Sequence, residues 1–168
     1  MRSFLVAVLV MALSGPALAF DDPKALVAAI YAPYETPGAA ANQDPAQFYS
    51  ERLKGLVSGH AAKAANDLLS SSEDAAAGTG PVAPALSFNP FIDAQHSLLM
   101  DLVIGEPILM KSKAMVPVNF SNFDHATMLT LSLVKDPDGW KVDDVASLGE
   151  GENWLLSWLL QYDPFSVN

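Results

Sequence analysis

The chain has 168 residues, of which 51% are hydrophobic and 17% charged, with nine Lys and Arg against nineteen Asp and Glu and no cysteine. This length suits one domain with a packed core. The net charge of −10 disfavours nucleic acid and anionic membranes as partners. The lack of cysteine excludes disulfides, thiolate metal ligands and a cysteine nucleophile.

The N-terminus has the pattern of a secretory signal peptide. Arg2 supplies positive charge, an apolar run of ten residues extends from Phe4 to Leu13, and Ala17-Leu18-Ala19 forms an A-x-A cleavage site. Ten helical residues measure about 15 Å, against a hydrocarbon core of about 30 Å, so stable membrane insertion is not expected. We predict cleavage between Ala19 and Phe20 and a periplasmic or secreted product with a single domain over residues 20–168.

The first half of this domain has helical patterning. Asp22-Pro23 and Asp44-Pro45 each combine an N-cap acceptor with proline at the first helical position, and each precedes apolar residues at helical spacing. The first helix is expected to end near Pro33 and the second near Val57. The alanine-rich stretch 60–69 either extends the second helix or forms a third, with Gly59 as the interruption. Small and polar residues at about 70–86 predict a flexible connection.

The second half changes to the two-residue period of strands. Apolar and polar or mixed residues alternate in its longer segments, which is typical of an antiparallel sheet covered by helices on one face. Pro117 cannot donate a ladder hydrogen bond, so its strand is predicted to be an edge strand or to carry a bulge. Trp154 and Trp158 share a helical face in a short closing helix over 153–161, where they either close the domain or form a homodimer contact. The expected strands cover 98–104, 107–110, 114–120, 127–134 and 140–145.

Two or three helices followed by an antiparallel meander predict an α+β domain of two layers. The sheet is expected to curve, and a short C-terminal helix completes the domain. A curved sheet tends to enclose a cavity against its helices, which is a natural site for a small molecule.

Several blocks of the chain carry a resemblance to a known fold. The most specific are Pro90-Phe91-Ile92-Asp93-Ala94-Gln95 and Gly139-Trp140-Lys141-Val142-Asp143-Asp144-Val145; Tyr31-Ala32-Pro33-Tyr34, Gln47-Phe48-Tyr49-Ser50 and 114–120 accompany them. The chain resembles a bacterial family of exported domains of unknown function, similar to the nuclear transport factor two-like superfold. The resemblance implies a conical, cystatin-like α+β fold with a pocket at its wide end and implies no particular activity. His96 stands where such proteins carry a second acidic residue.

Asp93, Gln95 and His96 follow the Pro90-Phe91 turn at the entrance to the predicted sheet. In one interpretation the Asp93 carboxylate orients the His96 imidazole as a general base. In the other, Asp93 caps a turn and Gln95 satisfies backbone groups at the junction. Strand geometry favours the second interpretation, because residues 93 and 96 of a strand face opposite sides.

Asp143 and Asp144 lie near the end of the last long strand. Adjacent strand residues face opposite ways, so only one carboxylate can point into a cavity. If Val142 faces the core, Asp144 shares its side and is the inward carboxylate. The alternative is that Asp144 is a solvent-facing or hydrogen-bonded residue at the strand end.

The remaining ligand-binding candidates are aromatic, and they join Asp93, Gln95 and Asp144. Tyr31, Tyr34 and Tyr49 lie on the segments expected to cover the sheet, and Phe91 lies in the turn before it. Buried tyrosine hydroxyls beside an inward carboxylate could bind a polar ligand or polarise a carbonyl. The alternative is that these rings are core residues with polar tips at the rim.

No metal and no cofactor is predicted. His60, His96 and His125 are far apart and lack the spacing of paired ligands. Asp136-Pro137-Asp138-Gly139 lacks the further oxygen ligands of a calcium loop and is explained by a hairpin turn.

These observations favour an exported, non-catalytic module that binds a small molecule or an envelope protein. The alternative is an enzyme that transfers a proton or eliminates water, with Asp144 or the Asp93/His96 pair as base and a Tyr31 or Tyr49 hydroxyl as acid. This alternative requires those side chains to converge on one ligand position.

Overall fold

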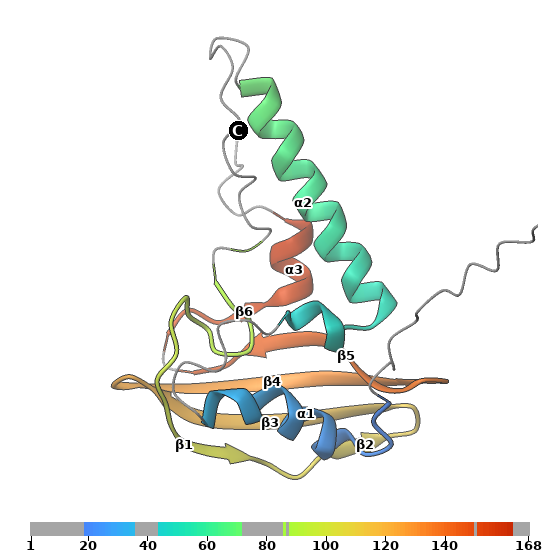
Figure 1. Ribbon diagram of the computed structural model, residues 1–168, viewed down its shortest axis with the longest axis vertical. Helices are drawn as coiled ribbons and strands as arrows, with labels where there is room; N and C mark the ends of the chain where they lie inside the picture. The colour runs from blue at the N-terminus through green and yellow to red at the C-terminus, as the bar shows by residue number, and fades with distance from the viewer. Residues whose placement is uncertain (1–18, 36–43, 72–85, 87, 150, 163–168) are drawn as a thin grey trace, which may run out of the picture.

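The computed structural model describes residues 19–35, 44–71, 86, 88–149 and 151–162 (Figure 1). The signal-peptide prediction therefore lies outside the described residues up to position 18, as do positions 72–85 of the predicted flexible connection. The helical elements are α1 (Pro23–Tyr31), η1 (Ala32–Glu35), η3 (Pro45–Phe48), α2 (Glu51–Ser71) and α3 (Leu156–Gln161). The strands are β1 (Leu99–Ile104), β2 (Ile108–Met110), β3 (Lys113–Asn122), β4 (His125–Asp136), β5 (Gly139–Ser147) and β6 (Trp154–Leu155).

The strands form one antiparallel, curved sheet that does not close, with the order β1-β3-β4-β5-β6 and with β2 beside β3. Its inner face is buried, as at Val116 and Leu131, while Met115 and Met128 on the outer face are exposed. α1 lies over the inner face and contributes Leu26, with Val27 and Ile30, to the same core (Figure 1). The predicted α+β class and the sheet covered on one face are confirmed.

Pro117 lies in an interior strand, so the prediction of an edge strand was wrong. β3 pairs with β4 on one side and with β1 and β2 on the other. The break occurs in the neighbour instead: β1 ends at Ile104, β2 begins at Ile108, and the Gly105 N–H donates to the Pro117 carbonyl at 2.8 Å. Pro117, which has no N–H to donate, therefore lies where the adjacent strand is interrupted.

The second helical segment differs from the expectation in two ways. Asp44-Pro45 begins only the short 3₁₀ helix η3, and α2 begins after Ser50, whose hydroxyl accepts the Leu53 N–H at 3.1 Å as an N-cap does. α2 then continues through Gly59 to Ser71, so the alanine-rich stretch extends the second helix, as one of the two alternatives predicted, and the interruption at Gly59 was wrong. Glycine costs a helix only about 1 kcal/mol, so a single glycine need not end it. Within the described residues, no helix is long and apolar enough to cross a membrane.

The chain just after the predicted cleavage site docks on the β4–β5 hairpin. The Trp140 N–H donates to the Phe20 carbonyl at 2.8 Å, and the Trp140 indole N–H donates to the Asp21 carbonyl at 3.1 Å. The Phe20 ring also packs against the Phe48 ring, with 6.4 Å between their centroids. Gly139, at φ 103°, leaves room for this approach, because a Cβ there would stand 2.6 Å from the Phe20 oxygen.

Candidate functional site

Side chains of α1 and β3 form hydrogen bonds to the backbone of the loop between residues 88 and 98. The Tyr31 hydroxyl donates to the Phe91 carbonyl at 2.8 Å. The Asn122 side chain, 5% exposed, donates to the His96 carbonyl at 3.1 Å and accepts the Leu98 N–H at 2.9 Å. Within the loop, Asn89 accepts the Phe91 N–H at 2.9 Å. These bonds satisfy backbone groups that the loop would otherwise leave unpaired.

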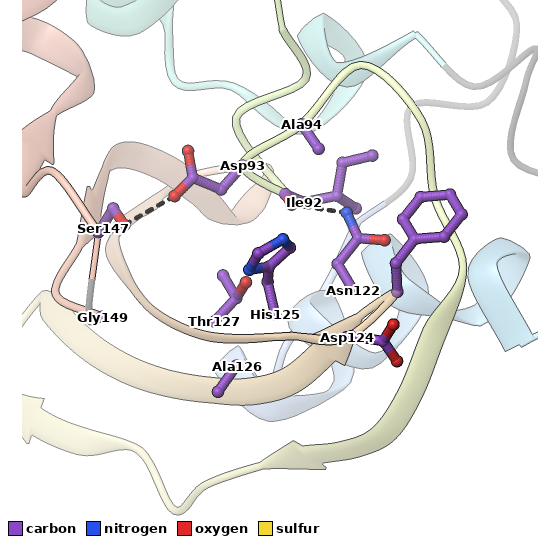
Figure 2. A pocket seen from close by; sticks show the side chains of 12 residues that line it. Ile92, Asp93, Ala94, Asn122, Asp124, His125, Ala126, Thr127, Ser147 and Gly149 are labelled. Carbon is purple, nitrogen blue, oxygen red and sulfur yellow. Dashed lines mark hydrogen bonds between the residues drawn. The ribbon is translucent and has the colours of Figure 1, made fainter.

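Asp93 is fixed at the centre of this region. Its two carboxylate oxygens accept hydrogen bonds from the Ser147 hydroxyl and the Trp154 indole N–H, both at 2.8 Å (Figure 2 shows the first). Its backbone has φ 52°, in the left-handed region, which aspartate tolerates better than most residues. Asp93 therefore joins the loop to the end of β5 and to β6.

A pocket of about 590 Å³ opens beside Asp93. Figure 2 shows its walls: Ile92 to Ala94 of the loop, the β3–β4 hairpin and the end of β5. His125 and Thr127 from the start of β4 project toward Asp93 across the cavity. The volume is within the range of small-molecule sites, and the lining is mixed, since methyl and aromatic groups alternate with carboxylate, amide, imidazole and hydroxyl groups.

The hairpin that forms one wall has an unusual turn. Phe123, at its tip, adopts φ 53° and is 47% exposed. A bulky residue in the left-handed region is uncommon and costs of order 1–3 kcal/mol. This strained residue lines the pocket.

Gln95 and His96, also candidates from the sequence, lie outside this pocket lining. Both side chains are exposed, and in the described residues neither side chain forms a hydrogen bond or ion pair. His96 contributes only its carbonyl, to Asn122. Asp93 and His96 therefore do not form the hydrogen bond that a base pair of these residues would require.

Asp143 and Asp144 do not follow the expected alternation. A bulge between Ser132 and Leu133 in the β4–β5 register pairs Ser132 with Asp144 and Leu133 with Val142. Val142 and Val145 are both fully buried, so Asp144 does not share the side of Val142, and that expectation was wrong. The extra residue of a bulge breaks the two-residue period, which the sequence pattern alone does not reveal.

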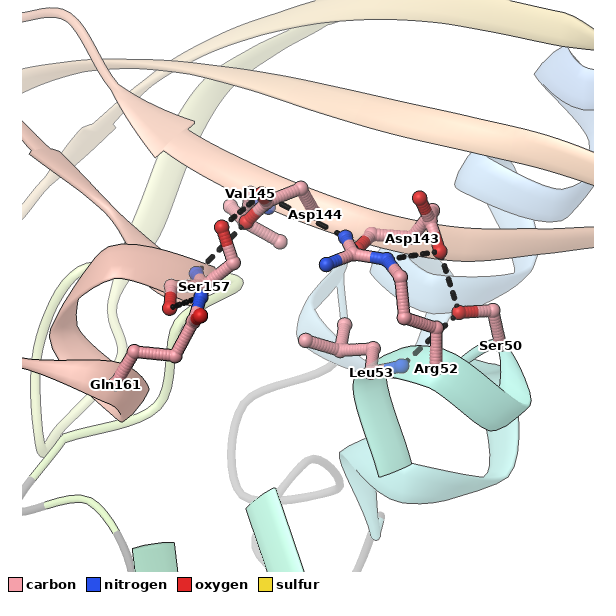
Figure 3. A network of polar contacts seen from close by, with 8 residues as sticks. All are labelled: Ser50, Arg52, Leu53, Asp143, Asp144, Val145, Ser157 and Gln161. Carbon is pink, nitrogen blue, oxygen red and sulfur yellow. Dashed lines mark hydrogen bonds and ion pairs between the residues drawn. The ribbon is translucent and has the colours of Figure 1, made fainter. Parts of the chain in front are cut away.

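Both carboxylates instead attach helices to β5 (Figure 3). Asp144 accepts the Ser157 N–H at 2.9 Å and the Ser157 hydroxyl, which holds the first turn of α3. Asp143 accepts the Ser50 hydroxyl at 2.7 Å and Arg52 Nε at 3.0 Å, which holds the first turn of α2. Arg52 Nη2 also donates to the Asp143 carbonyl, and it lies 3.8 Å from Asp144 Oδ2.

The electrostatics of this network are those of a structural anchor. Burial would raise the pKa of Asp143, but the hydrogen bonds and charge of Arg52, with the Ser50 hydroxyl, outweigh it and hold that pKa below its ordinary value. The hydrogen bond to Asp143 in turn raises the pKa of Arg52. A carboxylate held ionised in this way is poorly suited to accept and release a proton near neutral pH.

The tyrosine candidates belong to the core. Tyr31, Tyr34, Tyr49 and Phe91 are all buried, and they form two ring pairs: the centroids of Tyr31 and Tyr34 are 6.1 Å apart, and those of Tyr49 and Phe91 are 5.9 Å apart. Burial raises the pKa of Tyr31 and of Tyr49 well above the ordinary range, so both hydroxyls stay protonated. Tyr34 accepts a hydrogen bond from Asn89 at 2.6 Å. Tyr31 and Tyr34 form hydrogen bonds to the loop, and none of these four side chains lines the Asp93 pocket.

Asn122, His125, Thr127 and Ser147 are site residues that the sequence analysis did not single out. The only signal in the sequence is the polar run around Asn122 to His125 between two strand patterns, which also describes an ordinary turn. As for metals, the described part of the chain contains no group of three or more His, Asp or Glu side chains that could hold an ion.

Comparisons with known proteins add no relative: a scan of protein-family models, a search of curated proteins and a search of solved structures each found no match.

Proposed function

We propose that the protein is an exported, non-catalytic binding module that holds a small molecule in the pocket beside Asp93. The observation that carries this proposal is a cavity of about 590 Å³ whose walls are already fixed by hydrogen bonds from Tyr31, Asn122, Ser147 and Trp154. A preorganised cavity loses little conformational entropy when a ligand binds. Export rests on the signal-peptide pattern, with a mature chain that begins at Phe20.

The relationship to the cone-shaped, nuclear transport factor two-like superfold is part of the same proposal. Its support is the order of helices followed by an antiparallel, curved, unclosed sheet. A binding role suits the site better than proton transfer, because Asp93, His96 and Asp144 have separate partners in the described structure. The hydroxyls of Tyr31 and Tyr49 are buried away from the pocket.

Native mass spectrometry of the protein recovered from the envelope of exporting cells tests the small-molecule function. Ala94→Phe places a ring in the half-buried pocket wall, and Ala62→Phe makes the same change on an exposed position of α2. We expect a small-molecule adduct on the native protein and on A62F, and its loss from A94F. An adduct that persists in A94F, or a native protein that carries none, contradicts the proposal.

The same samples test the export part. Terminal sequencing is expected to show Phe20 first, and material that retains Met1 contradicts cleavage at the predicted site.

A further inference from the structure

A second pocket adjoins Asp93 on the side of β6 and α3. Its volume is about 460 Å³, and its lining includes the rings of Phe88, Trp154 and Trp158 together with the carboxylates of Asp93 and Glu152. No lysine or arginine of the described chain lines it. Three aromatic rings and two acids around one cavity are a different chemistry from the mixed lining of the first pocket.

Two rings of the aromatic wall, those of Phe88 and Trp154, are held by contacts within the protein. The Trp154 indole N–H donates to Asp93 at 2.8 Å. The Phe88 ring meets the Trp154 ring edge-on, with 5.2 Å between the ring centroids and 65° between the ring planes. Trp158 is 48% exposed, and its ring packs against the Tyr162 ring with 5.5 Å between their centroids. Indole rings have electron-rich faces that attract cations within about 6 Å of the ring centre.

The two carboxylates lack a cationic partner in the described structure. Asp93 accepts hydrogen bonds only from the neutral groups of Ser147 and Trp154, and Glu152 is exposed. None of the ion pairs between described residues involves either acid. The net charge of −10 over the whole chain adds a long-range attraction for positive ligands.

We propose that this pocket binds a small organic cation with a substituted ammonium group. The aromatic faces of Trp154 and Trp158 contact the ammonium, and Asp93 and Glu152 supply the opposite charge. Aromatic rings favour a weakly hydrated ammonium over a metal ion, which needs several oxygen or nitrogen ligands. This inference goes beyond the proposed function, because the second pocket shares only Asp93 with the first and is otherwise lined by different residues.

Titration with choline chloride, followed by the indole N–H resonances in ¹H–¹⁵N NMR, tests the proposal on the exported protein. The chain has three tryptophans, so the resonances are readily assigned. We expect saturable shifts of Trp154 and Trp158 and none of Trp140. The neutral isostere 3,3-dimethylbutan-1-ol is expected to bind about tenfold more weakly, since it keeps the shape and loses the charge.

Two leucine variants separate the aromatic face from general effects. Trp158→Leu is expected to raise the dissociation constant for choline about tenfold. Met110→Leu, which introduces the same residue at a position of similar exposure on β2, outside both pockets, is expected to leave it unchanged. Glu152→Gln is expected to weaken binding and its dependence on salt.

Equal affinity for choline and its neutral isostere, unshifted Trp154 and Trp158 resonances, or equal effects of W158L and M110L would overturn the proposal. Failure here is distinct from failure of the first proposal. W158L leaves the small-molecule adduct of the Asp93 pocket in place, and A94F leaves choline binding in place.

Discussion

Replacing Gly139 by alanine tests how the start of the domain docks on the sheet. The residue has φ 103°, where an L side chain costs about 1–3 kcal/mol. Its new Cβ would stand 2.6 Å from the Phe20 oxygen and 2.7 Å from the Phe20 nitrogen, so the backbone at Phe20 must move. That movement weakens the bond from the Trp140 N–H, worth about 0.5–1.5 kcal/mol. We therefore expect a loss of about 2–4 kcal/mol in the free energy of unfolding.

Urea denaturation followed by circular dichroism measures this loss, and α2 supplies the matched control. Gly59→Ala makes the same chemical change at a helical position with nothing within 4 Å of the new Cβ, so it should stabilise the protein by about 0.5–1 kcal/mol. In a chain that begins at Asp22, the clash with Phe20 is absent and only the backbone part of the Gly139→Ala cost should remain. A change within 0.5 kcal/mol for G139A, or an undiminished cost in the shortened chain, would refute the docking.

Two further predictions concern the anchors of the site. Asn122→Ala should destabilise the protein by about 2–4 kcal/mol in urea denaturation, because it leaves the Leu98 N–H and the His96 carbonyl unpaired, whereas the exposed Asn119→Ala should change stability by less than about 0.5 kcal/mol; equal effects would contradict this role. Asp143→Asn should lower stability at pH 7. Since the pKa of Asp143 is depressed on folding, its contribution is present above the unfolded value of about 3.9 and disappears as the pH falls through the folded value. The stability curves of D143N and the native protein should converge below about pH 4, and a constant gap would count against the ion pair.

The sequence by itself determined the class of the fold, the start of α1 and the strands β1 to β5, whereas Trp154 and Leu155 form β6 and not the start of the predicted closing helix. The strands begin and end within a few residues of their predicted bounds, because alternation of apolar residues is a local property that survives in the sheet. Asp22-Pro23 begins α1 as predicted, with the Asp22 carboxylate accepting the Ala25 N–H at 2.7 Å. Caps of this kind depend only on residues within one turn.

Only the tertiary structure decided the roles of the polar residues. The bulge in β5 reverses the expected side of Asp144, and bonds that span large distances along the chain join Asp143 to Arg52 and Asp93 to Trp154. Register and long-range pairing depend on which strands meet, and no local pattern carries that information. The tyrosines predicted to bind a ligand are therefore core residues, and two of them hold the loop beside the pocket. The two pockets lie beside Asp93, one lined by the β3–β4 hairpin and the other by β6 and α3.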